Sequence, residues 1–135
     1  MLKALDKEFK RYMSKNNAHR ILSAEETFDA IKNRHEQYED WVNLCLVVDD
    51  VGYDQLTVTT EQLKDVLDKI LTSGHFQLYG PPGEELCEKF GGNPIPRNVD
   101  TQALSKEIVT SGSPVGLLTA LVVAPYPDLH TWPWD

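Results

Sequence analysis

Residues 59–74 read TTEQLKDVLDKILTSG, and this stretch decides the fold. Thr59, followed three residues later by Gln62, is a capping box, in which the two residues satisfy open backbone donors at a helix start. Ser73 and Gly74 end the helical pattern. Between these limits the apolar residues recur every three or four positions, namely Leu63, Val66, Leu67, Ile70 and Leu71. The stretch therefore predicts an amphipathic helix with one face in the core.

A second helix is predicted upstream of this one. Ser23 and Glu26 form another capping box. From there an apolar seam with alternating spacings of three and four predicts a continuous helix as far as about Val48, with the seam formed by Phe28, Ile31, His35, Tyr38, Val42 and Cys45. The alternative is that residues 44–48, five apolar residues in a row, form a buried strand.

The chain from Gly80 onward holds all eight prolines and six of the eight glycines, which predicts short elements joined by turns. Brief helices are expected at residues 82–90, at residues 101–110 and from the Ser113-Pro114 pair onward. The apolar segment after Pro114 continues to Ala124 as a helix or, alternatively, contains a core strand at residues 117–123. Residues 93–98 are predicted to be extended, because each proline moves its predecessor out of the helical region.

The fold class that follows is mainly α: a single domain over residues 1–135, with five or six helices and a turn-rich last third that contains short strands. An α+β arrangement is the alternative. A chain of this length buries a core without a metal or a disulfide. The basic amphipathic helix predicted at the N-terminus is expected to dock on that core, and the alternative is a contact with a membrane surface or with nucleic acid. The segment PYPDLHTWPWD at residues 125–135 is expected to pack its tryptophans on the domain, or else to be an extended ligand for a partner.

Charge is strongly segregated along the chain. The net charge is -8 at pH 7. Residues 1–20 carry six Lys or Arg side chains against two acids, whereas residues 35–68 carry nine acids against the single base Lys64. The acidic balance argues against direct binding to nucleic acid, because such binding depends on Lys and Arg displacing counterions from the phosphates.

The leading functional hypothesis is a small, acidic, non-enzymatic interaction protein, a regulator or inhibitor that binds a macromolecular partner. A basic nucleic-acid-binding protein fits this hypothesis, because clustered carboxylates imitate the charge of a nucleic-acid backbone and steer a basic partner. Tyr53 is the expected aromatic anchor within the polar rim. The predicted partner-binding residues are Glu39, Asp40, Asp49, Asp50, Tyr53 and Asp54.

A divalent-cation site is the first alternative. Residues 49–54, DDVGYD, predict a turn with Gly52 at positive φ, and they lie between two predicted helices as in a calcium-binding helix-loop-helix. The ligand spacing of that motif is not met. With Asp50 as the first ligand, the position that requires the central glycine falls on Gln55. No metal and no cofactor are therefore predicted.

A small enzyme with a dispersed active site is the second alternative, with His35, His75 or His130 lining its pocket. No catalytic sequence motif supports it. Cys45 and Cys87 are far apart and show no metal-binding spacing, so we expect both thiols to be reduced and buried in a cytoplasmic protein. No run approaches the roughly 20 apolar residues that cross a bilayer, so no membrane association is predicted.

Overall fold

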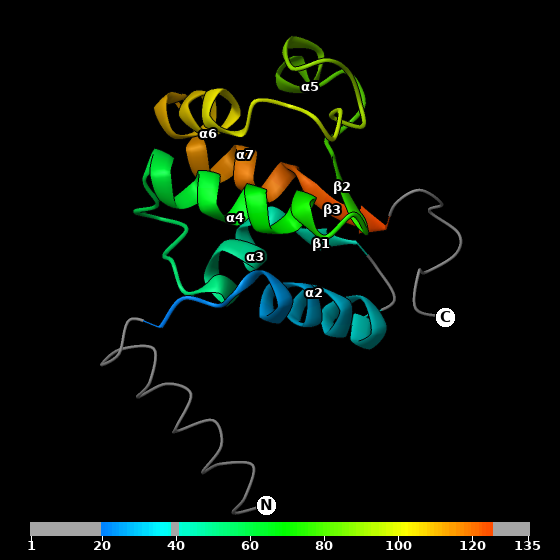
Figure 1. The fold of residues 1–135 in the computed structure, drawn as a ribbon. Coiled ribbons are helices and arrows are strands. Elements are labelled where there is room, and N and C mark those ends of the chain that lie inside the picture. The colour runs from blue at the N-terminus through cyan, green and yellow to red at the C-terminus, as the bar shows by residue number, and fades with distance from the viewer. Residues whose placement is uncertain (1–19, 39–40, 126–135) are drawn as a thin grey trace, which may run out of the picture.

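The computed structural model of the protein describes residues 20–38 and 41–125 (Figure 1). The predicted N-terminal helix, Glu39, Asp40 and the Trp-rich residues 126–135 lie outside these ranges. The described elements are α2 (Ala24–Tyr38), β1 (Val42–Asn43), α3 (Leu44–Val51), α4 (Thr60–Thr72), β2 (Phe76–Tyr79), α5 (Glu85–Lys89), α6 (Thr101–Thr110), α7 (Pro114–Ala120) and β3 (Val122–Pro125). Six helices with one small sheet confirm the predicted, mainly α fold class.

The three strands form an antiparallel sheet in the order β1-β3-β2, so the last strand in sequence lies in the centre. Val123 of β3 pairs with Val42 of β1 on one side and with Leu78 of β2 on the other. Ile95 extends the sheet by an isolated antiparallel bridge to Leu78, as expected from the extended segment predicted at residues 93–98, although residues 97 and 98 form a turn. All four side chains are buried in the hydrophobic core. The helices and one face of the sheet therefore share a single core cluster.

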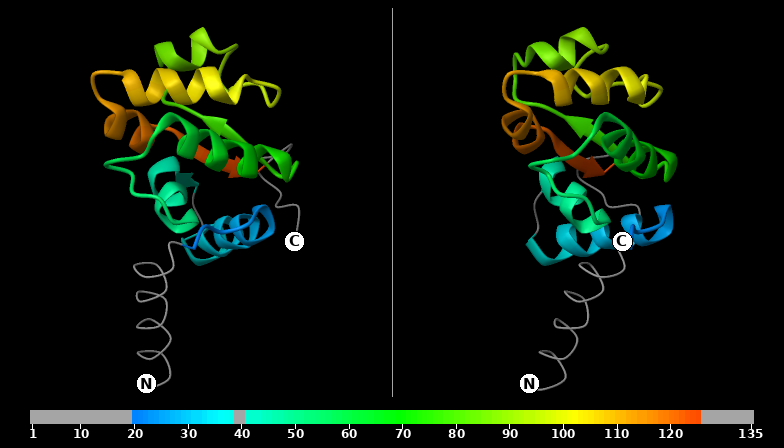
Figure 2. Two further views of the ribbon diagram at one scale, coloured as in Figure 1. Left: turned by 60° about the vertical axis from the view of Figure 1, so that its left-hand side comes forward. Right: turned by 90° about the vertical axis from the view of Figure 1, so that its left-hand side faces the viewer.

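Helix α4 lies across the middle of the molecule, with α2 at one end and α5 at the other (Figures 1 and 2). Its predicted apolar stripe is buried, and it packs against α6 on one side and α2 on another. The predicted capping box is present: the Thr59 hydroxyl accepts a hydrogen bond from the Gln62 amide at 3.2 Å, and the Gln62 side chain accepts from the Thr59 amide at 3.1 Å. The helix thus begins and ends where its sequence predicts.

Loss of this cap is expected to lower the free energy of unfolding. Thr59→Ala removes the hydroxyl that accepts from the Gln62 amide, and such substitutions cost about 1 kcal/mol. Urea denaturation followed by circular dichroism measures the change. Thr57→Ala is the matched control, because Thr57 is also exposed and lies just before the cap. Equal stability of the two variants would contradict the capping role.

The predicted continuous helix at residues 23–48 is wrong, because the chain forms two helices there. Helix α2 begins with the predicted capping box, in which the Glu26 amide donates to the Ser23 hydroxyl at 3.1 Å and the Glu26 carboxylate accepts from the Ser23 amide at 3.1 Å. It ends at Tyr38, and α3 begins only at Leu44. Residues 44–48 are helical, which confirms the favoured interpretation of that run over the strand alternative.

Pairing with β3 is the reason for the break. Val42 and Asn43 align with Val123 and Val122, and the amide of Leu44 then donates to the carbonyl of Leu121 at 2.8 Å. A residue whose backbone is committed to a neighbouring strand cannot also continue a helix. The apolar pattern of the sequence continues across the break between α2 and α3, because buried residues are apolar in a strand as well as in a helix. The pattern therefore does not reveal the break.

The last third is built from short pieces, as predicted. Ser113 and Pro114 open α7, and the apolar segment that follows is helix as far as Ala120 and then strand, so each of the two interpretations holds for one part. Helix α5 begins at Glu85 rather than near residue 82, because residues 81–83 form a turn with Gly83 at φ 79°. Strand β2 was not predicted, since its four residues are too short for a periodic signal.

Candidate functional site

The loop between α3 and α4, residues 52–59, donates hydrogen bonds to acids of the predicted site, which hold it in place; we call it the Leu56 loop. One carboxylate oxygen of Asp49 accepts from the Gln55 amide at 3.1 Å, and the other accepts from the Gln55 side chain at 2.8 Å. Asp54 accepts from the amide of Leu56 at 2.8 Å, which forms an Asx turn. Leu56 is thereby held outward with 72% of its surface exposed.

The loop starts later than the sequence predicts. Asp49 and Asp50 belong to the last turn of α3, so the predicted turn at residues 49–54 begins only at Gly52. Gly52 has φ 123°, which confirms the positive φ expected there. Its amide donates back to the carbonyl of Asp49 at 3.1 Å and ends the helix. Asp49 and Asp54 therefore lie on either side of the helix end and both bind the backbone of the loop.

Asp50 and Tyr53 face the body of the protein. Asp50 pairs with the guanidinium of Arg34 through two contacts, one of them at 2.8 Å, and so joins α3 to α2. The Tyr53 hydroxyl donates to Asp65 at 2.8 Å, while its ring packs on the core. Burial, together with the hydrogen bond and charge of Asp65, raises the pKa of Tyr53 to about 12. The phenol is therefore neutral at physiological pH and serves as a donor to α4.

Several acids of residues 35–68 are neutralised by bases that lie just outside that window. Lys32 lies 3.8 Å from Glu36, and Lys69 lies 2.8 Å from Asp65. Within the window, Lys64 pairs with Asp68 at 2.6 Å. Over the described ranges, no Lys or Arg forms a salt bridge with three acids that lie in the Leu56 loop or close to it in sequence: Asp49, Asp54 and Glu61. Among the described acids of residues 35–68, those without a salt bridge are therefore Asp49, Asp54 and Glu61, which lie within seven residues of Leu56 in the sequence.

The structure brings together two of the six predicted partner-binding residues, Asp49 and Asp54, at the Leu56 loop. Asp50 and Tyr53 are engaged with Arg34 and Asp65, and Glu39 and Asp40 lie outside the described ranges. Sequence reasoning missed Leu56 and left Glu61 out of the site. A usable signal was present: Leu56 is an apolar residue inside a turn, where no helix or strand period requires one.

The carboxylates around the Leu56 loop bind separate protein donors. Asp49 accepts hydrogen bonds from Gln55, and Asp50 accepts them from Arg34. Asp54 accepts a hydrogen bond from a backbone amide. Throughout residues 20–38 and 41–125, no three His, Cys, Asp or Glu side chains are grouped so that they could hold a metal ion. The described residues therefore provide no calcium cage at this loop.

The two described histidines make ring contacts with phenylalanines. His35 is buried, with its ring 6.2 Å from that of Phe76, and His75 is exposed, with its ring 5.1 Å from that of Phe28. The third predicted histidine, His130, lies outside the described ranges.

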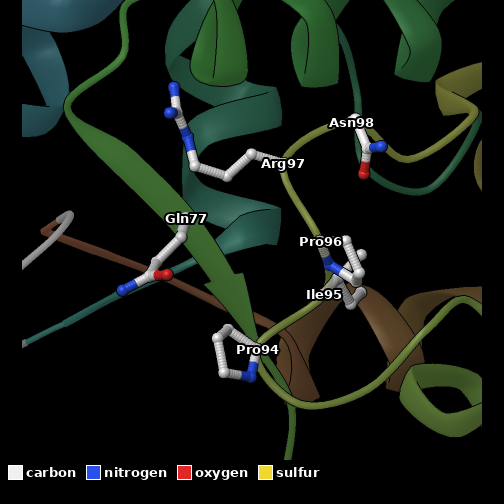
Figure 3. Close-up of a pocket in the computed structure, with 6 residues that line it drawn as sticks. All are labelled: Gln77, Pro94, Ile95, Pro96, Arg97 and Asn98. Carbon is white, nitrogen blue, oxygen red and sulfur yellow. The ribbon is translucent and has the colours of Figure 1, made fainter.

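A shallow hollow of about 380 Å³ is lined by one residue of β2 and by residues 94–98 (Figure 3). Its lining residues contribute amide, guanidinium and apolar groups, and they are Gln77, Pro94, Ile95, Pro96, Arg97 and Asn98. Arg97 extends toward the end of α4, where it donates to the carbonyl of Leu71 at 3.1 Å. None of the six side chains is a carboxylate, imidazole, thiol or hydroxyl, so they offer no general acid or base.

Helices within the described ranges are all too short or too polar to cross a membrane. Comparison of this chain with protein-family models, with curated proteins and with solved structures found no match.

Proposed function

We propose that this protein is a non-enzymatic regulator or inhibitor that binds a basic protein partner through the Leu56 loop. The observation that carries the proposal is the exposure of Leu56, 72%, on a loop held by its own acids. Leu56 replaces Tyr53 as the expected apolar anchor, since the Tyr53 hydroxyl is bound to Asp65. A nucleic-acid-binding protein is the expected class of partner, because its basic groove complements a cluster of carboxylates.

The arrangement supports binding for two physical reasons. An apolar side chain that enters a pocket on the partner supplies affinity, and the charged rim around it steers the encounter. The hydrogen bonds of Asp49 and Asp54 fix the loop before binding, so less conformational entropy is lost on association. Asp54 and Glu61 are both exposed and lie two and five residues from Leu56 in the sequence, so we assign them the charge of the rim.

The proposal includes a cytoplasmic location. Cys45 and Cys87 are both buried and free, which agrees with a reducing compartment. Burial, followed by the negative charge of Glu84, raises the pKa of the Cys87 thiol, so this cysteine stays protonated and unreactive at neutral pH.

Charge at the Leu56 loop is expected to control the rate of association. The double variant Asp54→Asn, Glu61→Gln keeps an oxygen that accepts from the Leu56 amide but removes two charges. We expect it to slow association with the partner by roughly 3–10-fold at low salt and to flatten the salt dependence. The measurement is surface plasmon resonance against the partner captured from native lysate by the wild-type chain.

Two matched controls distinguish the effect of the Leu56 loop from that of charged or apolar residues elsewhere on the protein. Glu85→Gln, Glu88→Gln removes the same two charges from exposed positions on α5, at the other end of the molecule, and is expected to leave the rate unchanged. Leu56→Ser is expected to weaken capture, whereas Leu46→Ser, at a leucine with 36% exposure on α3, is expected to retain it. Equal effects of the two charge variants, or of the two leucine variants, would remove the Leu56 loop from the interface.

A further inference from the structure

Leu56 lies at the tip of a β-turn formed by residues 54–57. The Thr57 amide donates to the carbonyl of Asp54 at 3.1 Å, which closes the turn with Leu56 at its third position. The Asp54 carboxylate accepts from the Leu56 amide within the same turn. Both hydrogen bonds are local to the turn. The direction of Leu56 relative to the rest of the protein therefore depends on how the turn is attached to the body of the fold.

The chain is attached to the core on both sides of this turn. On one side the Tyr53 ring packs against the core cluster, and on the other side Val58 belongs to that cluster, with 8% of its surface exposed. The Val58 side chain is wholly apolar, whereas Tyr53 also carries a hydroxyl. That hydroxyl donates to Asp65 of α4 at 2.8 Å. Tyr53 therefore links the loop to α4 through a contact with a defined direction.

The acceptor of this hydrogen bond is itself held in place. Lys69, four residues after Asp65 on α4, donates to the same carboxylate oxygen at 2.8 Å. Only 17% of the Lys69 side chain is exposed, so its motion is restricted by packing. A hydrogen bond to a charged acceptor is stronger than one between neutral groups. Lys69, Asp65 and Tyr53 therefore form one connected chain of polar contacts from α4 to the Leu56 loop.

We infer that Tyr53 is a positioning residue for Leu56, and that its hydroxyl, bound to Asp65, keeps the Leu56 loop in its binding conformation before a partner binds. This inference rests on the proposed function, because it concerns how the same loop associates with the partner. Removal of the hydroxyl leaves the ring in the core but lets the loop populate other conformations. Only the fraction of molecules in the binding conformation can associate, so the apparent affinity falls by that fraction.

A positioning role differs in its kinetics from the other roles at this loop. Truncation of a residue that contacts the partner mainly raises the dissociation rate. Removal of a carboxylate slows association most at low salt, because salt screens charge. Tyr53→Phe changes neither the charge nor Leu56 itself. We therefore expect it to slow association by roughly 3–10-fold at both low and high salt, with an unchanged dissociation rate.

Amide hydrogen exchange, measured by NMR on the full chain without a partner, tests the effect on the loop. The amides of residues 55–57 are all hydrogen-bonded within the loop or to Asp49. In Tyr53→Phe they are expected to exchange roughly 3–10-fold faster, because the loop opens more often. Tyr79→Phe is the matched control. It removes a tyrosine hydroxyl that accepts from Gln77 in β2, and it is expected to leave these three rates unchanged.

Variants of Asp65 test whether the hydroxyl acts through this carboxylate. Asp65→Asn keeps an oxygen that can accept from the Tyr53 hydroxyl, whereas Asp65→Ala removes the acceptor. We expect the exchange rates of residues 55–57 to match those of Tyr53→Phe in Asp65→Ala and to lie closer to the wild type in Asp65→Asn. The double variant Tyr53→Phe, Asp65→Ala is expected to exchange no faster than either single variant, since both changes remove the same hydrogen bond.

Equal exchange rates in Tyr53→Phe and Tyr79→Phe would overturn the inference. Faster exchange with an unchanged association rate, measured by surface plasmon resonance against the captured partner, would also overturn it. Equal capture by Leu56→Ser and Leu46→Ser would instead contradict the proposed function, and the role of Tyr53 in binding would then fail with it. The exchange measurement needs no partner, so the two failures are distinguishable.

Discussion

Replacing Phe76 with Ala is expected to lower the free energy of unfolding by about 3–5 kcal/mol, the range found when a fully buried aromatic residue is truncated. Phe76 is 0% exposed. Its ring lies 5.5 Å from that of Phe28 and 6.2 Å from that of His35, so it joins β2 to α2. Truncation removes these contacts and leaves a cavity between the sheet and the helix.

Urea denaturation measures this loss, with Leu56→Ala as the control. Leu56 is 72% exposed, so its truncation is expected to change stability by less than about 0.5 kcal/mol. Phe76→Leu keeps most of the apolar volume and is expected to cost about 1 kcal/mol, which gives a measurable variant if the alanine protein does not fold. A loss below that of Phe76→Leu for the alanine variant would contradict the place of β2 in the core.

The contrast between α4 and β2 shows how much of the fold the sequence predicts. Helix α4 has thirteen residues with a capping box and a buried stripe, so several local signals agree. Strand β2 has only four residues, too few for a periodic signal, and it is defined by pairing with Val122–Pro125, far along the chain. The break between α2 and α3 has the same origin, because Val42 is held by Val123. The sequence pattern does not show which distant segments pair as strands, so it predicts neither β2 nor this break.

The candidate site shows a similar division. Local chemistry predicts that the acids of residues 49–54 surround a turn with Gly52 at positive φ, and the structure agrees apart from the later start of the turn. The neutralisation of Asp50 comes from Arg34, sixteen residues away on another helix. Tyr53 is likewise engaged by Asp65. Which acids remain uncompensated is decided by tertiary contacts, so charge counted along the sequence overstates the charge available at the surface.

Gly52→Ala is expected to lower the free energy of unfolding by roughly 2–4 kcal/mol, since it combines backbone strain with a steric clash. Gly52 has φ 123°, which residues with a Cβ rarely adopt. An added Cβ would lie 2.7 Å from the carbonyl oxygen of Arg20 and 3.1 Å from the side chain of Ile21. The backbone there cannot easily move, because the Leu22 amide donates to the Val51 carbonyl at 2.9 Å.

Gly83→Ala is the matched control for Gly52→Ala, because Gly83 also has positive φ, 79°, but an added Cβ would meet no atom within 4 Å. It is expected to cost about 1–2 kcal/mol, the strain of a left-handed conformation alone. The difference between the two losses in urea denaturation measures the contact between residues 20–22 and the end of α3. Equal losses would contradict that contact. Because Gly52 begins the Leu56 loop, the folded fraction of Gly52→Ala should also bind the partner more weakly, whereas Gly83→Ala should bind as the wild type does.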